Sequence, residues 1–120
     1  MARCDEGYLC DVCGRDVEGV PVSDLYLRYV LGEVDPLKLP QARERHIRCN
    51  PAIAQYIVAP DFPPVLCTSV FAKEHLDVEF VRQEEARITR GWRRLQEIPY
   101  LGITIPEYPL EDVRAAWRAK

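Results

Sequence analysis

Two short segments of this 120-residue chain each place two potential metal ligands three positions apart. CDVCG carries Cys10 and Cys13, and RHIRCNP carries His46 and Cys49. Three thiolates and one imidazole can fill a tetrahedral structural zinc site, and a tight turn lets both side chains of a pair reach one ion. The intervening 32 residues are an acceptable loop, because closure entropy grows only with the logarithm of length. The spacing therefore predicts one Zn²⁺ per chain.

The other cysteines and the expected compartment bear on this prediction. No apolar run approaches the roughly 18 residues of a membrane span, and the first ten residues include acidic ones where a signal peptide would be apolar. We therefore expect a cytoplasmic protein with reduced thiols and no membrane association. Cys4 is the alternative ligand, and Cys67 is expected to be a buried small side chain. A redox dithiol, an iron–sulfur cluster and the absence of a cofactor are the competing interpretations of the four residues.

Length and proline positions predict the domain organisation. A chain of 120 residues with 48% apolar and 29% charged residues is typical of one globular domain with a core that needs no disulfides. Ten prolines punctuate the chain, and they favour loops because proline fixes φ and biases the preceding residue away from helix. We expect a zinc-binding zone at 1–58, a proline-rich connector at 59–76 and a helical zone at 77–120.

Local patterns predict the elements of the zinc-binding zone. Glycines and alternating apolar residues around the first thiol pair are typical of a short hairpin. Residues 24–31 fit a helix that ends at Gly32, but their alternation also fits a strand. Asn50 is a good N-cap and Pro51 suits the first helical position, so we expect a helix immediately after Cys49.

The strongest helical pattern lies in the second zone, over 77–98. Asp77 is a candidate cap, and apolar residues recur three, four or seven positions apart at Val81, Ile88, Trp92 and Leu95. Gly91 should weaken this helix by up to about 1 kcal/mol relative to alanine. A short final helix is expected within 110–120. The predicted fold class is α+β, with a small zinc-stapled hairpin-plus-helix zone packed against a helical zone.

The thiol knuckle, the hairpin and the second ligand pair ahead of a helix resemble the treble-clef group of zinc-binding domains. The H-x2-C half is similar to the first finger of LIM domains. This resemblance covers residues 8–58 and implies a structural zinc held by Cys10, Cys13, His46 and Cys49. The chain differs from LIM domains in its long intervening segment and in lacking their second zinc site.

Arginine-rich segments suggest a second kind of partner. Residues 43–48 and 82–94 carry several arginines and no lysine, and a guanidinium group suits phosphates. A nucleic-acid face would use Arg43, Arg45, Arg48, Arg90, Arg93 and Arg94. The competing interpretation is a set of solvated helix ion pairs, which the net charge of −3 favours.

The motif content argues against catalysis and favours binding. The sequence has no GxSxG, HExxH or glycine-rich phosphate loop, and the four expected ligands leave a zinc ion no open position. We therefore expect a protein–protein interaction module, with nucleic-acid binding as the alternative and a redox or metal-handling role third. Trp92 and Trp117 are either anchors for a partner or core residues.

Overall fold

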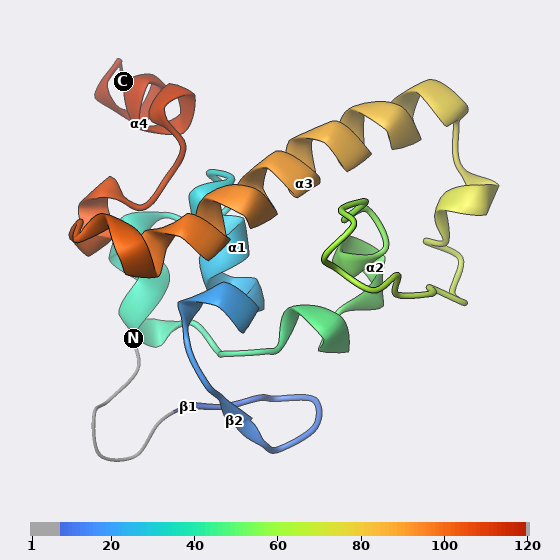
Figure 1. Ribbon diagram of the computed structural model, residues 1–120, viewed down its shortest axis with the longest axis horizontal. Coiled ribbons are helices and arrows are strands. Elements are labelled where there is room, and N and C mark those ends of the chain that lie inside the picture. Colours follow the sequence, from blue (N-terminus) through green and yellow to red (C-terminus); the bar gives the residue numbers. More distant parts are fainter. Residues whose placement is uncertain (1–7, 120) are drawn as a thin grey trace.

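The computed structural model describes residues 8–119, and its N-terminal hairpin is built around the first thiol pair (Figure 1). β1 (Tyr8–Leu9) pairs antiparallel with β2 (Asp16–Val17). In the turn between them, the Cys10 N–H donates to the Arg15 carbonyl at 2.8 Å. Gly14 has a φ of 77°, a left-handed conformation that glycine adopts without strain. The expected hairpin is therefore present.

Residues 24–31 form a helix rather than a strand. α1 (Asp24–Val30) begins where Ser23 Oγ accepts a hydrogen bond from the Tyr26 N–H at 3.1 Å. The side-chain oxygen satisfies one of the amide groups that a helix N-terminus leaves without a partner. At the other end Gly32 takes a φ of 85°, which stops the helix. The helix interpretation is confirmed, and most of α1 is buried.

The helix expected after Cys49 is only one turn long. α2 (Pro51–Ala54) follows a 3-10 turn at Ile47–Cys49. Asn50 stands at the N-cap position of α2, as predicted, but its side chain makes no capping hydrogen bond. Its Nδ2 instead donates at 3.1 Å to Oδ1 of Asp24, a residue 26 positions away.

The second half of the chain is helical after a long loop. α3 (Val78–Leu101) begins with Asp77 accepting from the Phe80 N–H at 3.1 Å, as expected. It is longer than predicted, because it continues through Pro99 to Leu101 and ends at Gly102 with a φ of 64°. α4 (Glu111–Arg118) is the expected final helix.

One hydrophobic core joins the two halves of the described chain. α1 packs against α3, and buried residues of both helices belong to the same cluster. Gly91 permits a close approach, since a Cβ there would lie 2.5 Å from Leu31 Cδ2. Trp92 packs edge-to-face on Phe62 with 5.4 Å between ring centroids. Trp117 stacks on Tyr29 at 5.9 Å and is partly buried against the core, whereas Trp92 is a buried member of it.

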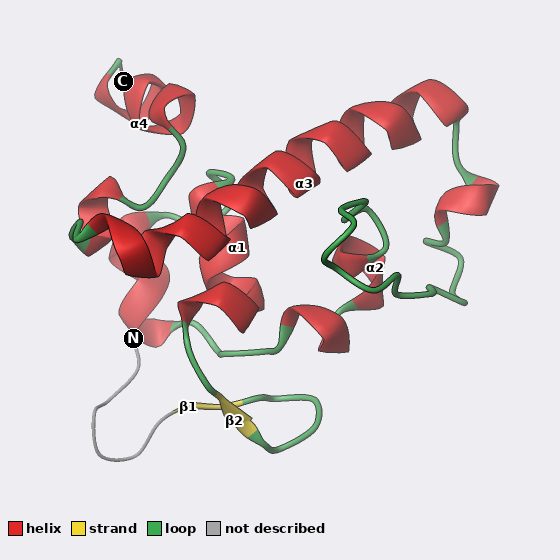
Figure 2. Cartoon of the chain, in the orientation of Figure 1, coloured by secondary structure: helices red, strands yellow, loops and turns green. Residues whose placement is uncertain are grey.

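Helix dominates the described residues, and the hairpin is their one sheet (Figure 2). The β part of the predicted α+β class is thus confined to two strands of two residues each. No helix within 8–119 is long and apolar enough to cross a membrane.

Candidate metal centre

The four predicted ligands converge on one point. One ligand atom from each of Cys10, Cys13, His46 and Cys49 lies within 4.8 Å of all the others. His46 Nδ1 is 3.4 Å from Cys13 Sγ and 3.8 Å from Cys49 Sγ. A tetrahedral zinc site with its usual bond lengths has N–S edges of about 3.6 Å and S–S edges of about 3.8 Å. The donor set and its spacing therefore fit a Zn²⁺ ion.

Two turns from distant parts of the sequence supply these ligands. The hairpin turn carries the first pair, and the 3-10 turn at Ile47–Cys49 follows directly after His46. The Asp11 N–H donates to the Glu44 carbonyl at 3.0 Å. Arg45 binds the Asp11 carboxylate with two hydrogen bonds, at 2.8 and 3.0 Å. These contacts hold the two turns together independently of an ion.

The orientation of the His46 ring follows from two acceptors on its outer side. Nε2 lies 2.8 Å from the Asp16 carbonyl and 3.0 Å from Glu18 Oε1. A carbonyl and a carboxylate can only accept, so Nε2 carries a proton and Nδ1 is the ring nitrogen that faces the thiols. Metal-binding histidines commonly donate their other ring nitrogen in this way, which fixes the tautomer. Burial alone would lower the pKa of His46, but hydrogen bonds with Glu18, the thiols and the Asp16 carbonyl raise it to about 9.

The thiols differ in their surroundings. Burial would raise the pKa of Cys10, but N–H donors from Cys13, His46 and Val12 outweigh it and lower the pKa to about 6. Two of these donors, the amides of Val12 and His46, lie 3.4 Å from its sulfur. Burial and the neighbouring Cys10 and Cys13 sulfurs raise the pKa of Cys49 to about 11. Cys10 is thus the sulfur best prepared to be a thiolate ligand.

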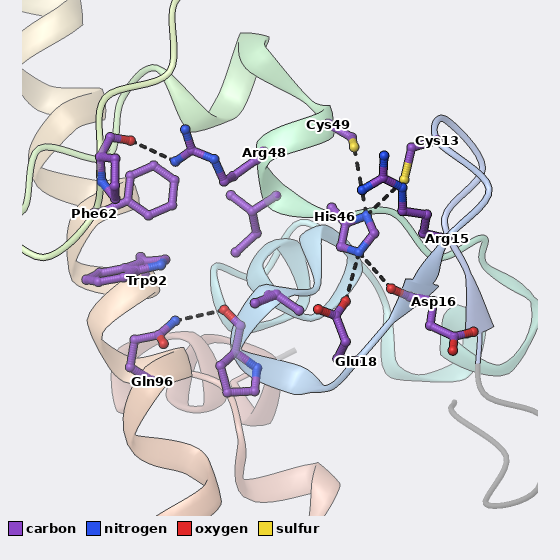
Figure 3. A pocket seen from close by; sticks show the side chains of 14 residues that line it. Cys13, Arg15, Asp16, Glu18, His46, Arg48, Cys49, Phe62, Trp92 and Gln96 are labelled. Carbon is purple, nitrogen blue, oxygen red and sulfur yellow. Dashed lines mark hydrogen bonds and ion pairs between the residues drawn. The ribbon is translucent and has the colours of Figure 1, made fainter.

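The centre borders an open groove of about 790 Å³. Figure 3 shows Phe62 and Trp92 on one side of this groove and His46 with Glu18 on the other. Cys10 is 3% exposed, whereas Cys13 is exposed. The four side chains would occupy all positions of a tetrahedral ion, which suits structural rather than catalytic chemistry.

Cys67, the other cysteine among residues 8–119, lies outside the cluster. The expectation that Cys67 is buried is wrong: it is partly exposed, with its sulfur 3.3 Å from Ser69 Oγ. It lies in the segment between α2 and α3. Cys4, the alternative ligand, lies outside the described residues.

The three arginines of the first basic segment differ in their contacts. Arg43 is exposed and has no hydrogen bond or ion pair with any residue of 8–119. Arg45 is paired with Asp11. Arg48 donates to the Pro63 carbonyl at 2.8 Å and lies 5.2 Å above the Phe62 ring centroid.

The second basic segment lies in another groove, of about 650 Å³, formed mainly by α3 and α4. Arg90 is paired with Asp112 at 3.0 Å, and Arg93 lies 4.0 Å from Asp61. Arg94 donates to the carbonyls of Tyr108 and Glu107. Arg90 and Arg93 thus form ion pairs, and Arg94 binds backbone carbonyls.

Sequence reasoning missed the groups that surround the ligands. Glu18 and the Asp16 carbonyl hold His46, and Asp24 holds the residue after Cys49. Glu18 lies near the first thiol pair in sequence, which was an available signal, whereas nothing local identifies Asp24.

Comparison with known proteins yields no matching family model, no matching curated protein and no matching solved structure.

Proposed function

We propose that this chain binds one structural Zn²⁺ ion through Cys10, Cys13, His46 and Cys49. The observation that carries the proposal is the convergence of these four ligand atoms within 4.8 Å, with His46 Nδ1 facing the sulfurs of Cys13 and Cys49. Three sulfurs and one imidazole favour zinc over magnesium or calcium, which prefer oxygen ligands. Thiol ligands require reduced cysteines, which favours the cytoplasm.

The role of the ion is to join the hairpin turn to the segment ahead of α2. Neither element is large enough to be stable alone, because β1 and β2 have two residues each and α2 has four. A site formed only in the folded chain converts metal-binding free energy into folding free energy. We therefore expect the N-terminal half to depend on the ion more than α3 does.

The direct experiment is elemental analysis of the purified protein together with serine variants. We expect one zinc per chain in the wild type and less zinc in Cys10→Ser, Cys13→Ser and Cys49→Ser. Cys67→Ser is the matched control, because it removes a thiol outside the cluster and should keep the stoichiometry at one. A wild-type protein that takes up no zinc under reducing conditions would refute the proposal.

We further propose that the groove beside the metal centre is a binding surface for another protein. The support is the groove beside the centre, whose far wall carries Phe62 and Trp92 while the metal ligands form the near wall. Concave apolar surfaces with a few polar groups are common binding sites. The partner would insert an apolar side chain against the aromatic wall, and the ion would fix the opposite wall.

A photo-crosslinking amino acid at Val22, which is exposed and lines the groove, tests this binding surface. We expect zinc-dependent crosslinked species in native extract whose increase in size survives nuclease treatment. The same group at Leu37, exposed elsewhere on the surface, is the control. Crosslinks that only nuclease removes would support the nucleic-acid alternative instead.

A further inference from the structure

The start of α1 holds the chain segment that carries the second ligand pair. The Asp24 N–H donates to the Arg45 carbonyl at 2.7 Å, and Ser23 forms an isolated antiparallel bridge with His46. Ser23 Oγ also donates to Glu44 Oε1 at 2.7 Å. Together with the Asn50 to Asp24 hydrogen bond, these contacts bracket both ligands of the segment, one on each side.

Two carboxylates of this network are removed from water. Asp24 is 0% exposed and Glu44 is 4% exposed. Burying a carboxylate is costly, and burial raises the pKa of both groups above the ordinary range. Asp24 is compensated by Arg28, whose Nε lies 3.0 Å from Oδ2, and by Asn50. Glu44 is compensated by the Ser23 hydroxyl.

Burying these two carboxylates lowers the stability of the fold, but their hydrogen bonds fix the position of the segment that carries His46 and Cys49. Apolar residues of similar volume often stabilise a core as well as a buried polar network does, so fixed geometry is one reason to retain charges there. The segment held in this way is 44–50, which contains two of the four ligands. Neither carboxylate belongs to the ligand cluster itself.

We propose that Asp24 and Glu44 are positioning residues for the metal centre. Glu44, through Ser23, sets the place of His46, and Asp24, through Asn50, sets the place of Cys49. The two contacts preorganise the second ligand pair against α1, so that the ion binds without first having to order it. This inference rests on the proposed zinc site and adds the groups outside it that set its affinity.

The test compares zinc affinity with fold stability in matched variants. Asn50→Ala removes the donor to Asp24, and Glu44→Leu removes the acceptor of Ser23. Glu44→Gln keeps an acceptor oxygen and is the conservative variant. Thr89→Val is the control: Thr89 Oγ1 bonds Val58 N–H at 2.9 Å and the Tyr56 carbonyl at 3.1 Å, so its loss weakens the fold by a comparable local change away from the ligands.

Zinc affinity is measured by competition with a chromophoric chelator, ligand geometry by the absorption of the Co²⁺-substituted protein, and stability by urea unfolding with chelator present. We expect Asn50→Ala and Glu44→Leu to bind zinc about tenfold more weakly and to shift the cobalt bands, in line with the effects of other groups outside a metal's ligands. Glu44→Gln and Thr89→Val should keep wild-type affinity and spectrum.

The outcomes separate the two proposals. If the wild type binds zinc and both Asn50→Ala and Glu44→Leu bind it equally well, the positioning role is wrong and the zinc site stands. If Thr89→Val weakens zinc binding as much as they do, the effect is general destabilisation and the positioning role is again wrong. Should Glu44→Leu fail to fold, Asn50→Ala decides, since it removes only one partly buried donor. A wild type without zinc affinity refutes the site itself.

Discussion

Gly91 of α3 lies against Leu31, the residue that follows α1, so closely that a Cβ on Gly91 would stand 2.5 Å from Leu31 Cδ2 and 2.8 Å from its Cγ. Leu31 is 9% exposed, so its side chain has little space into which it could move. The glycine therefore sets how closely the two principal helices of the core approach.

Gly91→Ala should destabilise the protein, although alanine is the better helix former. Helix propensity favours alanine by about 1 kcal/mol, while overpacking a core typically costs about 1–3 kcal/mol. We expect a net loss in the free energy of unfolding, measured by urea denaturation. Gln83→Ala, on an exposed turn of α3, is the control and should change little. If Gly91→Ala were more stable than the wild type, α1 and α3 could move apart enough to admit the methyl group without a loss of packing energy, and the prediction would be wrong.

Zinc binding should release protons and strengthen with pH. In the metal-free protein His46 has a pKa of about 9 and Cys49 of about 11, so both are protonated at pH 7–8 and both must lose a proton to bind the ion. Each proton released raises the apparent association constant about tenfold per pH unit. We expect the apparent association constant, measured by chelator competition, to rise by at least about 100-fold between pH 7 and 8. A rise below tenfold would contradict these protonation states.

Glu18→Ala should weaken zinc binding only modestly. Glu18 accepts from His46 Nε2 at 3.0 Å, but the Asp16 carbonyl accepts from the same atom at 2.8 Å and remains in the variant. Losing a sole partner of this kind costs about 10- to 100-fold in affinity, so we expect a loss below tenfold. Glu74→Ala, exposed and outside the cluster, is the control. A hundredfold loss would show that the carboxylate alone orients the ring.

Chelation should loosen the N-terminal half before it loosens α3. Hydrogen exchange measured with and without a chelator should show faster exchange at the hairpin and over 44–54. The amides of α3 near Ile88, which is 0% exposed, should change less, because their protection comes from apolar packing. Uniform acceleration along the chain would instead indicate that the ion and the core form one cooperative unit.

Nucleic acid should bind weakly. Arg90 and Arg94 already have partners in Asp112 and in two backbone carbonyls, so few guanidinium groups are free for phosphates. We expect any binding at low salt to fall steeply as salt rises, measured by fluorescence anisotropy with duplex and single-stranded probes. Submicromolar affinity near physiological salt, lost on replacing Arg90, Arg93 and Arg94, would overturn this expectation.

The sequence was most informative where the signal is local. Cys10 and Cys13 are three positions apart in a turn, and Asp77 precedes a regular apolar stripe, so the first ligand pair and the start of α3 could both be predicted. Pairing the thiols with His46 and Cys49 relied on chemistry rather than proximity, because few other ligand sets in the chain complete a tetrahedral site.

The sequence did not predict the contacts that Asn50 and Gly91 make, because both are made with distant residues. Asn50 occupies the predicted N-cap position of α2, but its side-chain amide donates to the buried Asp24 carboxylate instead of accepting from the helix. Gly91 reads as a weak point of a helix, but its missing side chain makes room for Leu31. Neither relationship is encoded within a few residues of the position concerned.

The order of the ligands along the chain has a consequence for synthesis. All four proposed ligands occur within the first 49 residues, whereas α3, which packs on α1, begins at Val78. A nascent chain leaving the ribosome therefore completes its metal-binding set well before the helix that covers α1 has been made. An ion captured at that stage would close a loop containing α1 and hold its apolar face ready until α3 emerges to pack on it.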